Sequence, residues 1–378
     1  MTRAVIVGYA RSPFTPAHKG ALAQTRADDM AAAVVKALLK RSKVKAADVE
    51  DLIVGCAFPE GEQGFNVARL IGFLAGLPQH VAGMTVNRFC GSSLQAVQIA
   101  AGAIATGAGE VFICAGVESM SRVPIGGFNP LPNPKLYETM PEAYMGMGET
   151  AENVATKFKV SRAEQDAFAL ESQAKATTAQ AKGLLRDEIV PLDTPHGVVD
   201  ADGCLRPETT AAGLADLKPA FDKDGSVTAG TSSPLTDGAA AVLVVSEAYA
   251  KKHKLPILAV VKSFAVSGCA PEIMGMGPVE ATRKALERAG LKLKDMDVIE
   301  LNEAFSAQSL AVAKALKLDM AKVNLDGGAL ALGHPLGATG ARIVGKAASL
   351  LKRTKGRYAL ATQCIGGGQG IAMILEKA

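Results

Sequence analysis

Tryptophan is absent from this chain of 378 residues, and aromatic residues together make up only 4% of it. Long apolar runs are missing as well, since no stretch reaches the ~20 residues that a membrane-spanning helix requires. A strand-like segment begins as early as residues 4–7, before any stretch that resembles a targeting presequence. We therefore expect a protein without a membrane partner that resides in the cytoplasm.

The chain also lacks a strong net charge, and its Cys and His residues are not spaced as in metal sites. The formal net charge is only +4, and basic residues are mixed with acidic ones rather than gathered along a nucleic-acid backbone. No spacing of Cys and His is typical of a metal site. The cysteines lie far apart, which favours reduced thiols over a disulfide framework. The sequence therefore predicts neither a nucleic-acid partner nor a metal centre. The cysteines are residues 56, 90, 114, 204, 269 and 364.

Apolar residues are abundant, at 48%, and the chain contains 39 glycines. Its two ends read alike: each has a strand, a helix and a strand in series, and later a buried strand, at residues 110–116 and 357–363. This alternation indicates an α/β fold with helices covering the sheets, and the likeness indicates an internal duplication. We expect an N-terminal half over residues 1–120 to which 231–255 return, a loop domain over 121–230, and a C-terminal half over 256–378.

Cys90 stands between a strand-like segment, residues 81–86, and a segment with helical spacing, residues 93–106. Gly91 allows a tight turn there, and the serines after it can cap the helix. An isolated cysteine is more often a small buried hydrophobe. A thiol at a helix N-terminus, however, faces unpaired N–H groups and the positive end of the helix dipole, which favour the thiolate. We therefore predict a nucleophile with a lowered pKa.

Further segments can supply partners for such a nucleophile. His334 lies in a glycine-dense loop that can present its side chain into a cleft, although it could also be an ordinary surface or core histidine. Cys364 ends a predicted buried strand, where it is either a packing residue or a thiol suited to exchanging protons. The backbone N–H of Gly366 can approach a substrate oxygen together with that of Cys90, as an oxyanion hole requires. These segments together predict acyl chemistry on sulfur.

Seven segments resemble the thiolase family, and they extend over essentially the whole chain. They are NRFCGSSLQA, AGVESMS, TAENVA, DGAAAVLV, NEAF, GGALALGHPLGATGAR and CIGGGQG. The resemblance implies the thiolase fold, with two mixed five-stranded halves layered α-β-α-β-α, an inserted loop domain, and a homodimer or homotetramer. It also implies CoA and acyl-CoA thioesters as partners, with CoA as a substrate and no permanently bound cofactor.

The resemblance further implies roles for individual residues. Cys90 would carry the acyl group, His334 would activate Cys90 and help bind the thioester oxygen, and Cys364 would act as acid and base. Asn302, which otherwise reads as a helix cap, would orient a catalytic water together with His334. Glu303 would contact and support Asn302 without touching the substrate itself.

CoA contacts are implied at Arg206, Ser233, Phe221 and Met147. Gly146 stands where short-chain biosynthetic members usually carry a histidine, which favours the degradative type. We therefore expect thiolytic cleavage of 3-ketoacyl-CoA by CoA, as in fatty-acid β-oxidation. The alternatives are a biosynthetic acetoacetyl-CoA thiolase, a decarboxylating ketoacyl synthase, and a non-catalytic lipid-carrier relative.

Overall fold

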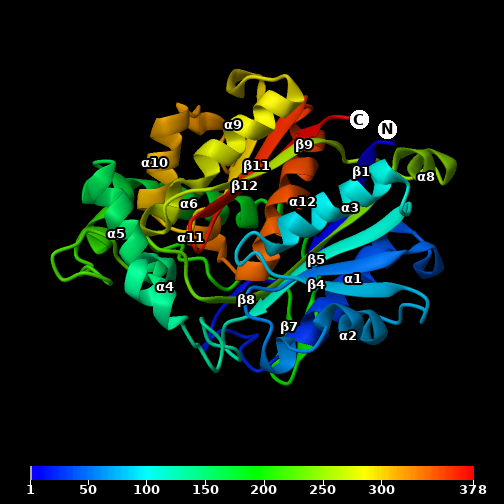
Figure 1. The fold of residues 1–378 in the computed structure, drawn as a ribbon, viewed down its shortest axis with the longest axis horizontal. Coiled ribbons are helices and arrows are strands. Elements are labelled where there is room, and N and C mark those ends of the chain that lie inside the picture. Colours follow the sequence, from blue (N-terminus) through cyan, green and yellow to red (C-terminus); the bar gives the residue numbers. More distant parts are fainter. Residues whose placement is uncertain (1) are drawn as a thin grey trace.

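A ten-stranded sheet runs through the structure, a computed structural model that describes residues 2–378 (Figure 1). The N-terminal half supplies β1 (Ala4–Arg11), β3 (Asp51–Gly55), β4 (Ala82–Val86), β5 (Val111–Ser119) and β8 (Thr236–Ser246). The C-terminal half supplies β9 (Ala259–Gly268), β10 (Val298–Leu301), β11 (Tyr358–Ile365) and β12 (Gln369–Glu376). The short β2 (Thr15–Pro16) pairs with β8.

The two halves of the sheet repeat one topology. Their orders are β1-β8-β5-β3-β4 and β9-β12-β11-β10, and in both the antiparallel pairs come first and the parallel pairs follow. A single parallel bridge between Ile299 and Val323 stands where the C-terminal half would have its fifth strand. The halves join where Val5 pairs with Val260. The predicted duplication is therefore confirmed, whereas the expected five strands per half hold only for the N-terminal half of the described chain.

Helices form three layers around these strands. They include α1 (Ala27–Ser42), α2 (Val67–Leu74), α3 (Ser92–Thr106), α9 (Gly277–Ala289), α10 (Ser306–Leu316) and α12 (Leu336–Thr354). The central helices α3 and α12 pack against each other and share one apolar core with strands of both halves. Helices α1 and α2 cover the outer face of the N-terminal strands, and α9 and α10 cover that of the C-terminal strands (Figure 1). The expected α-β-α-β-α layering is confirmed.

The close approach of α3 and α12 depends on glycine. A Cβ atom at Gly340 would overlap the backbone of Leu94, and one at Gly116 would overlap the carbonyl oxygen of Gly337. Helix α12 is buried along most of its length, so it has no free side on which to move away. Gly340 therefore sets the spacing between the two central helices, and Gly116, which belongs to β5, sets the spacing between that strand and the start of α12.

Between β5 and β8 the chain leaves the sheet and forms the inserted region. This region contains α4 (Pro134–Thr139), α5 (Met147–Lys157), α6 (Arg162–Ala181), α7 (Ala211–Ala215) and a hairpin of β6 (Leu192–Thr194) and β7 (Gly197–Val199). Ser161 and Glu164 form a capping box at the start of α6. The Ser161 N–H donates to Glu164 Oε2 over 2.7 Å, and Ser161 Oγ accepts from the Glu164 N–H. Asn133 caps α4, its side chain accepting from the N–H groups of Lys135 and Leu136. The limits of the loop domain stay a prediction.

None of the helices within residues 2–378 is both long enough and apolar enough to cross a membrane. Over the same residues, no group of His, Cys, Asp and Glu side chains is arranged to hold a metal ion.

Candidate active site

Cys90 lies in a tight turn between β4 and α3. Phe89 before it has a positive φ of 41°, a conformation that costs energy outside glycine and is often found at functional sites. The Ser92 hydroxyl holds the turn closed, accepting from the Arg88 N–H over 2.9 Å and donating to the Phe89 carbonyl over 2.6 Å. The side-chain amide of Gln363 donates to the Cys90 carbonyl. The turn therefore fixes the backbone of Cys90 from both halves of the fold.

His334 lies in the equivalent turn before α12. Its backbone N–H donates to Thr236 Oγ1 over 3.0 Å, and its ring Nδ1 lies 2.6 Å from Thr339 Oγ1. The Thr339 hydroxyl donates to the Pro335 carbonyl, so it accepts from Nδ1–H of the imidazole. The Asn302 amide nitrogen lies 3.3 Å from Nε2. This pattern assigns the proton to Nδ1 and leaves Nε2 free to accept one.

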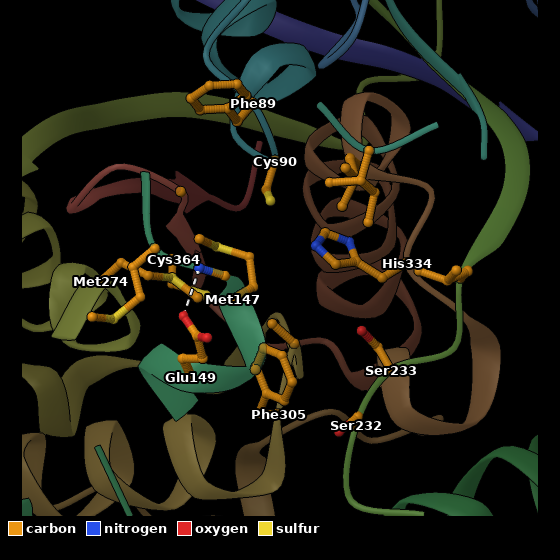
Figure 2. Close-up of a pocket in the computed structure, with 18 of the residues that line it drawn as sticks. Phe89, Cys90, Met147, Glu149, Ser232, Ser233, Met274, Phe305, His334 and Cys364 are labelled. Carbon is orange, nitrogen blue, oxygen red and sulfur yellow. Dashed lines mark hydrogen bonds between the residues drawn. The ribbon is translucent and has the colours of Figure 1, made fainter. Parts of the chain in front are cut away.

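The duplication explains why the two turns meet. Cys90 precedes α3 and His334 precedes α12, and these helices are neighbours in the central layer. Figure 2 shows the Cys90 side chain and the His334 ring reaching into one cavity, with Cys364 beside them at the end of β11. A thiol and an imidazole thus come from corresponding positions of the two halves.

The cavity that they share has a volume of about 650 Å³ and is mostly apolar. It is large enough for the chain of an acyl thioester. Its wall includes Phe58, Phe89, Cys90, Met120, Tyr144, Gly146, Met147, Glu149, Phe221, Ser232, Ser233, Met274, Phe305, His334, Cys364 and Gly366. Figure 2 shows that Met147 and Glu149 come from the start of α5, so the inserted region closes one side of the cavity.

Burial decides the protonation states of the site. It raises the pKa of the Cys90 thiol to about 12, although the backbone N–H groups of Gly366 and of Cys90 itself act in the opposite direction. Burial and the charge of Arg342 lower the pKa of His334 to about 3. The predicted lowered pKa of Cys90 is therefore wrong, because lost hydration outweighs the N–H groups at the turn. The resting pair is a neutral thiol and a neutral imidazole.

Cys364 is the second thiol of the cavity. Only 1% of the residue is exposed, and burial raises its pKa well above the usual value, as does the proximity of Cys90. It packs among apolar residues of α5, of the loop before β8, of the segment after β9 and of the segment that starts α10. Two adjacent thiols that both resist ionisation suit the passage of a proton through one while the other bonds covalently.

The structure brings most of the predicted site residues together. The wall of the cavity contains Cys90, His334, Cys364 and Gly366, and also the expected CoA contacts Met147, Phe221 and Ser233. Asn302 does not line the cavity itself, but its side chain contacts His334, which does. Arg206 is exposed and lies outside the lining of the cavity. Glu303 does not line the cavity and accepts from Ser172, Asn324 and Leu330.

Several residues of the site escaped the sequence analysis. Thr339 follows His334 within the first turns of α12 and could have been found as the first polar side chain after it. Thr236 and Gln363 are remote in sequence from the turns they support, and no pattern marks them. Phe305 of the NEAF segment forms an edge contact with Phe221, with ring centroids 6.0 Å apart. Aromatic packing of this kind depends on the fold and cannot be predicted from spacing.

Comparisons with known proteins agree on one family. A model described as the thiolase N-terminal domain matches residues 4–248, and one for the thiolase C-terminal domain matches residues 255–377. The chain is 48% identical to a 3-ketoacyl-CoA thiolase of Bacillus subtilis, with 100% of each covered. It is 49% identical to one of Vibrio cholerae, again with 100% of each covered. Human mitochondrial 3-ketoacyl-CoA thiolase, solved also with CoA, superposes with a TM-score of 0.93 at 40% identity, covering 100% of this chain and 98% of the CoA-bound one.

Proposed function

This chain belongs to the thiolase family, and on that premise we propose that it cleaves 3-ketoacyl-CoA with CoA to acetyl-CoA and a shortened acyl-CoA. The observation that carries the proposal is the pair of thiols, Cys90 and Cys364, beside the neutral imidazole of His334 in one cavity. One thiol can hold the acyl group while the other moves protons. The Claisen condensation is the same path in reverse.

Cleavage begins when Cys90 Sγ gives its proton to Nε2 of His334, the ring nitrogen that carries none. The sulfur attacks the ketone carbon, and the N–H groups of Cys90 and Gly366 stabilise the alkoxide. Both N–H groups already approach the sulfur in the resting site. The carbon–carbon bond then breaks, so that the acyl group stays on Cys90 and the enolate of acetyl-CoA takes a proton from Cys364.

Asn302 supports the enolate in this scheme. Its Nδ2 faces His334, and its Oδ1 is buried without a hydrogen-bond partner among residues 2–378. A buried amide oxygen without a partner is unfavourable and can accept from a water. That water can in turn donate to the thioester oxygen, next to the imidazolium of His334. Asn302 and His334 therefore stabilise the oxygen on which negative charge develops.

The second half of the reaction regenerates the enzyme. The incoming CoA thiol gives its proton to the Cys364 thiolate and attacks the acyl carbonyl. The tetrahedral oxygen again faces the N–H groups of Cys90 and Gly366. Cys90 leaves as a thiolate and recovers its proton from His334, so both thiols and the imidazole return to their neutral forms.

CoA binds as a substrate in this proposal, and no cofactor is permanently bound. Met147, Phe221 and Ser233 line the cavity and can follow the pantetheine arm. Arg206, exposed on the inserted region, can meet the anionic nucleotide end. The human relative solved with CoA supports CoA as the ligand of this fold.

We extend the proposal to assembly and location: a homodimer or homotetramer in the cytoplasm. Strand β4 is at the end of the sheet order, so no strand among residues 2–378 pairs with its outer edge. Such an edge can pair with a strand of a second copy. Phe65 nearby is 95% exposed, which is unusual for a large apolar side chain. Mass measurement in solution would test the assembly.

A spectroscopic assay tests the activity. Acetoacetyl-CoA and longer 3-ketoacyl-CoA esters should lose their enolate absorbance when the protein and CoA are added together. Cys90→Ser, which removes the sulfur and keeps the turn, is the matched control and should be inactive. A folded wild-type protein that leaves every ester intact would overturn the proposal and favour a non-catalytic relative.

A further inference from the structure

The turn that carries His334 is held at both ends by buried carboxylates. On the N-terminal side, the Leu330 N–H donates to Glu303 Oε2 over 3.2 Å. On the C-terminal side, the Gly337 N–H donates to Glu118 Oε2 over 2.9 Å. Glu303 belongs to the same half as His334, whereas Glu118 comes from β5 of the other half. The Gly337 contact is therefore a direct bond between the two halves, beside the imidazole.

Glu118 is 1% exposed. Among residues 2–378, the groups that donate hydrogen bonds to it are all neutral. Its carboxylate accepts from the N–H of Ala57 over 2.8 Å and of Phe58 over 3.2 Å, and from the Gln63 amide over 3.0 Å. Together with the Gly337 N–H, these donors occupy the lone-pair directions that an ionised carboxylate offers. The group is thus fully satisfied without a basic partner.

These partners connect Glu118 to both sides of the catalytic cavity. Gly337 opens α12, directly after the turn of His334. Phe58 lines the cavity and packs on Phe89, the neighbour of Cys90, with ring centroids 5.9 Å apart. One carboxylate therefore fixes the start of α12 and the loop after β3 relative to each other.

The chemistry of Glu118 indicates that an ionised carboxylate is needed here to accept several hydrogen bonds, and that the side chain does more than fill space. A buried carboxylate without a cation is costly, and an apolar side chain of similar size would pack at lower cost. Burial raises the pKa of Glu118, while the N–H groups of Ala57, Gly337 and Phe58 act against that rise. The N-terminus of α12 also favours negative charge at this place. What only a carboxylate provides is acceptance of all these donors at once.

We propose that Glu118 is a positioning residue of the proposed thiolase reaction, acting through Gly337 to hold His334 in place for proton exchange with Cys90. Glu118 does not line the cavity and touches no reacting atom. Its negative charge also raises the pKa of Cys90, so loss of the charge alone would favour the thiolate and speed alkylation. A slower rate therefore reports the placement of the imidazole. This inference rests on the proposed function, but the Cys90–His334 pair can be probed without any acyl-CoA.

The test is a double-mutant cycle of Glu118→Gln and His334→Ala, measured as the rate at which iodoacetamide alkylates Cys90. In the wild-type background, Glu118→Gln should lower this rate, and kcat for thiolysis with it, by about 10–100-fold while KM stays unchanged, because a displacement of ~1 Å costs about 10²-fold. In the His334→Ala background, the same substitution should leave alkylation unchanged or faster, because no imidazole remains to be displaced.

Two results would overturn the inference. One is an equal loss in both backgrounds, which would mean that Glu118 acts without His334. The other is an unchanged rate in folded Glu118→Gln. If Glu118→Gln does not fold, Glu118→Asp, which keeps the charge but is one methylene shorter, goes through the same cycle with the same expected outcomes.

The matched control is Glu188→Gln. Glu188 is another buried carboxylate bonded to α12, through Lys346 over 2.9 Å, but it lies away from the turn of His334. We expect Glu188→Gln to lower the melting temperature without changing the alkylation rate. If wild-type Cys90 is alkylated in a His334-dependent manner but no thiolysis occurs, the proposed activity fails while the cycle still decides the role of Glu118.

Discussion

Asn302 Nδ2 lies 3.3 Å from Nε2 of His334, so the reactive nitrogen of the imidazole has a fixed polar neighbour before substrate arrives. Thr339 holds the opposite nitrogen at 2.6 Å. The ring is therefore oriented from both sides, in a cavity wall that excludes most water. A neutral imidazole held in this way can take a proton from a thiol and return it without turning.

The first prediction concerns Cys90. Iodoacetamide should alkylate Cys90 first and abolish turnover. Cys56 and Cys114 are fully buried away from the cavity, and the half-buried Cys269 has its pKa raised by burial and by the charge of Glu272. With a thiol pKa of about 12 at Cys90, little thiolate exists at pH 7–8, so His334→Ala should slow alkylation by about 10²–10⁴-fold. The difference should shrink as the pH rises toward 12, where the thiolate forms unaided.

Peptide mass spectrometry after one equivalent of reagent measures the order of labelling. Preferential modification of Cys56 or Cys114 with full activity retained would contradict the assignment. A His334-independent rate at neutral pH would instead restore the low-pKa thiolate that the helix terminus alone suggested.

The second prediction is a stability effect of His334. In the unfolded chain a histidine binds a proton below about pH 6.5, but folded His334 stays neutral down to about pH 3. Between these values the unfolded state binds more protons, so stability is lost as the pH falls and is unaffected above pH 6.5. The slope from this one group is up to about 1.4 kcal/mol per pH unit.

Urea unfolding of wild type and His334→Gln at pH 7, 6 and 5 checks this. The variant has no titrating ring, so its free energy of unfolding should fall less steeply over this range. Parallel slopes for the two proteins would show that the imidazole takes up a proton in the folded state as well.

The third prediction separates the roles of the two cysteines. Cys364→Ala should still accept an acetyl group on Cys90 but should complete thiolysis or condensation about 10²–10⁴-fold more slowly, as is typical for a missing acid or base. The acetyl-enzyme can be trapped and weighed, and the steady-state rate measured in parallel. Rates like those of wild type would leave Cys364 as a packing residue.

The features predicted correctly from the sequence are those with local causes. The turn at Cys90 needs only the change from a strand-like to a helical pattern around it. The likeness of the two ends of the chain likewise predicted the repeated sheet. These signals lie within single segments, so the sequence is sufficient for them.

The features that escaped prediction depend on segments brought together by folding. The pKa of Cys90 is set by walls contributed by α5 and by the loops at His334 and Phe305, which exclude water from the thiol. Glu118 reads as one polar residue in a buried strand, and its partner Gly337 is 219 positions away. The shortened fifth strand of the C-terminal half is also a tertiary outcome, with Val323 alone retaining the bridge.

The fourth prediction concerns the acyl chain. Gly146 has an ordinary φ of −63°, and the nearest atom that a Cβ there would meet is a Glu149 carboxylate oxygen 3.5 Å away, so a larger residue can be accommodated. In the wild type this space beside Gly146 is open to the acyl group, so the protein should act on medium or longer 3-ketoacyl chains. Gly146→His should reduce kcat/KM for those chains by about tenfold or more while sparing acetoacetyl-CoA.

A panel of 3-ketoacyl-CoA esters of increasing length measures this preference, with Gly146→Ala as the control for the backbone change. Strict preference of the wild type for the four-carbon ester would contradict the degradative assignment and favour a biosynthetic thiolase.

The last prediction concerns the nucleotide end of CoA. Arg206 is exposed, but its backbone is fixed, because its N–H donates to Gln173 Oε1 over 2.9 Å and its carbonyl accepts from Thr209 over 2.7 Å. A held backbone with a free guanidinium suits a phosphate or the face of an adenine. Arg206→Ala should raise KM for CoA substrates about two- to fivefold, the range for an exposed ion pair, and leave kcat nearly unchanged. A pantetheine thioester, which lacks the nucleotide, should show no such rise. Arg283→Ala, which removes an exposed cation from the outer helix α9, should alter neither value. Equal KM changes for both thioesters would mean that Arg206 does not contact the nucleotide.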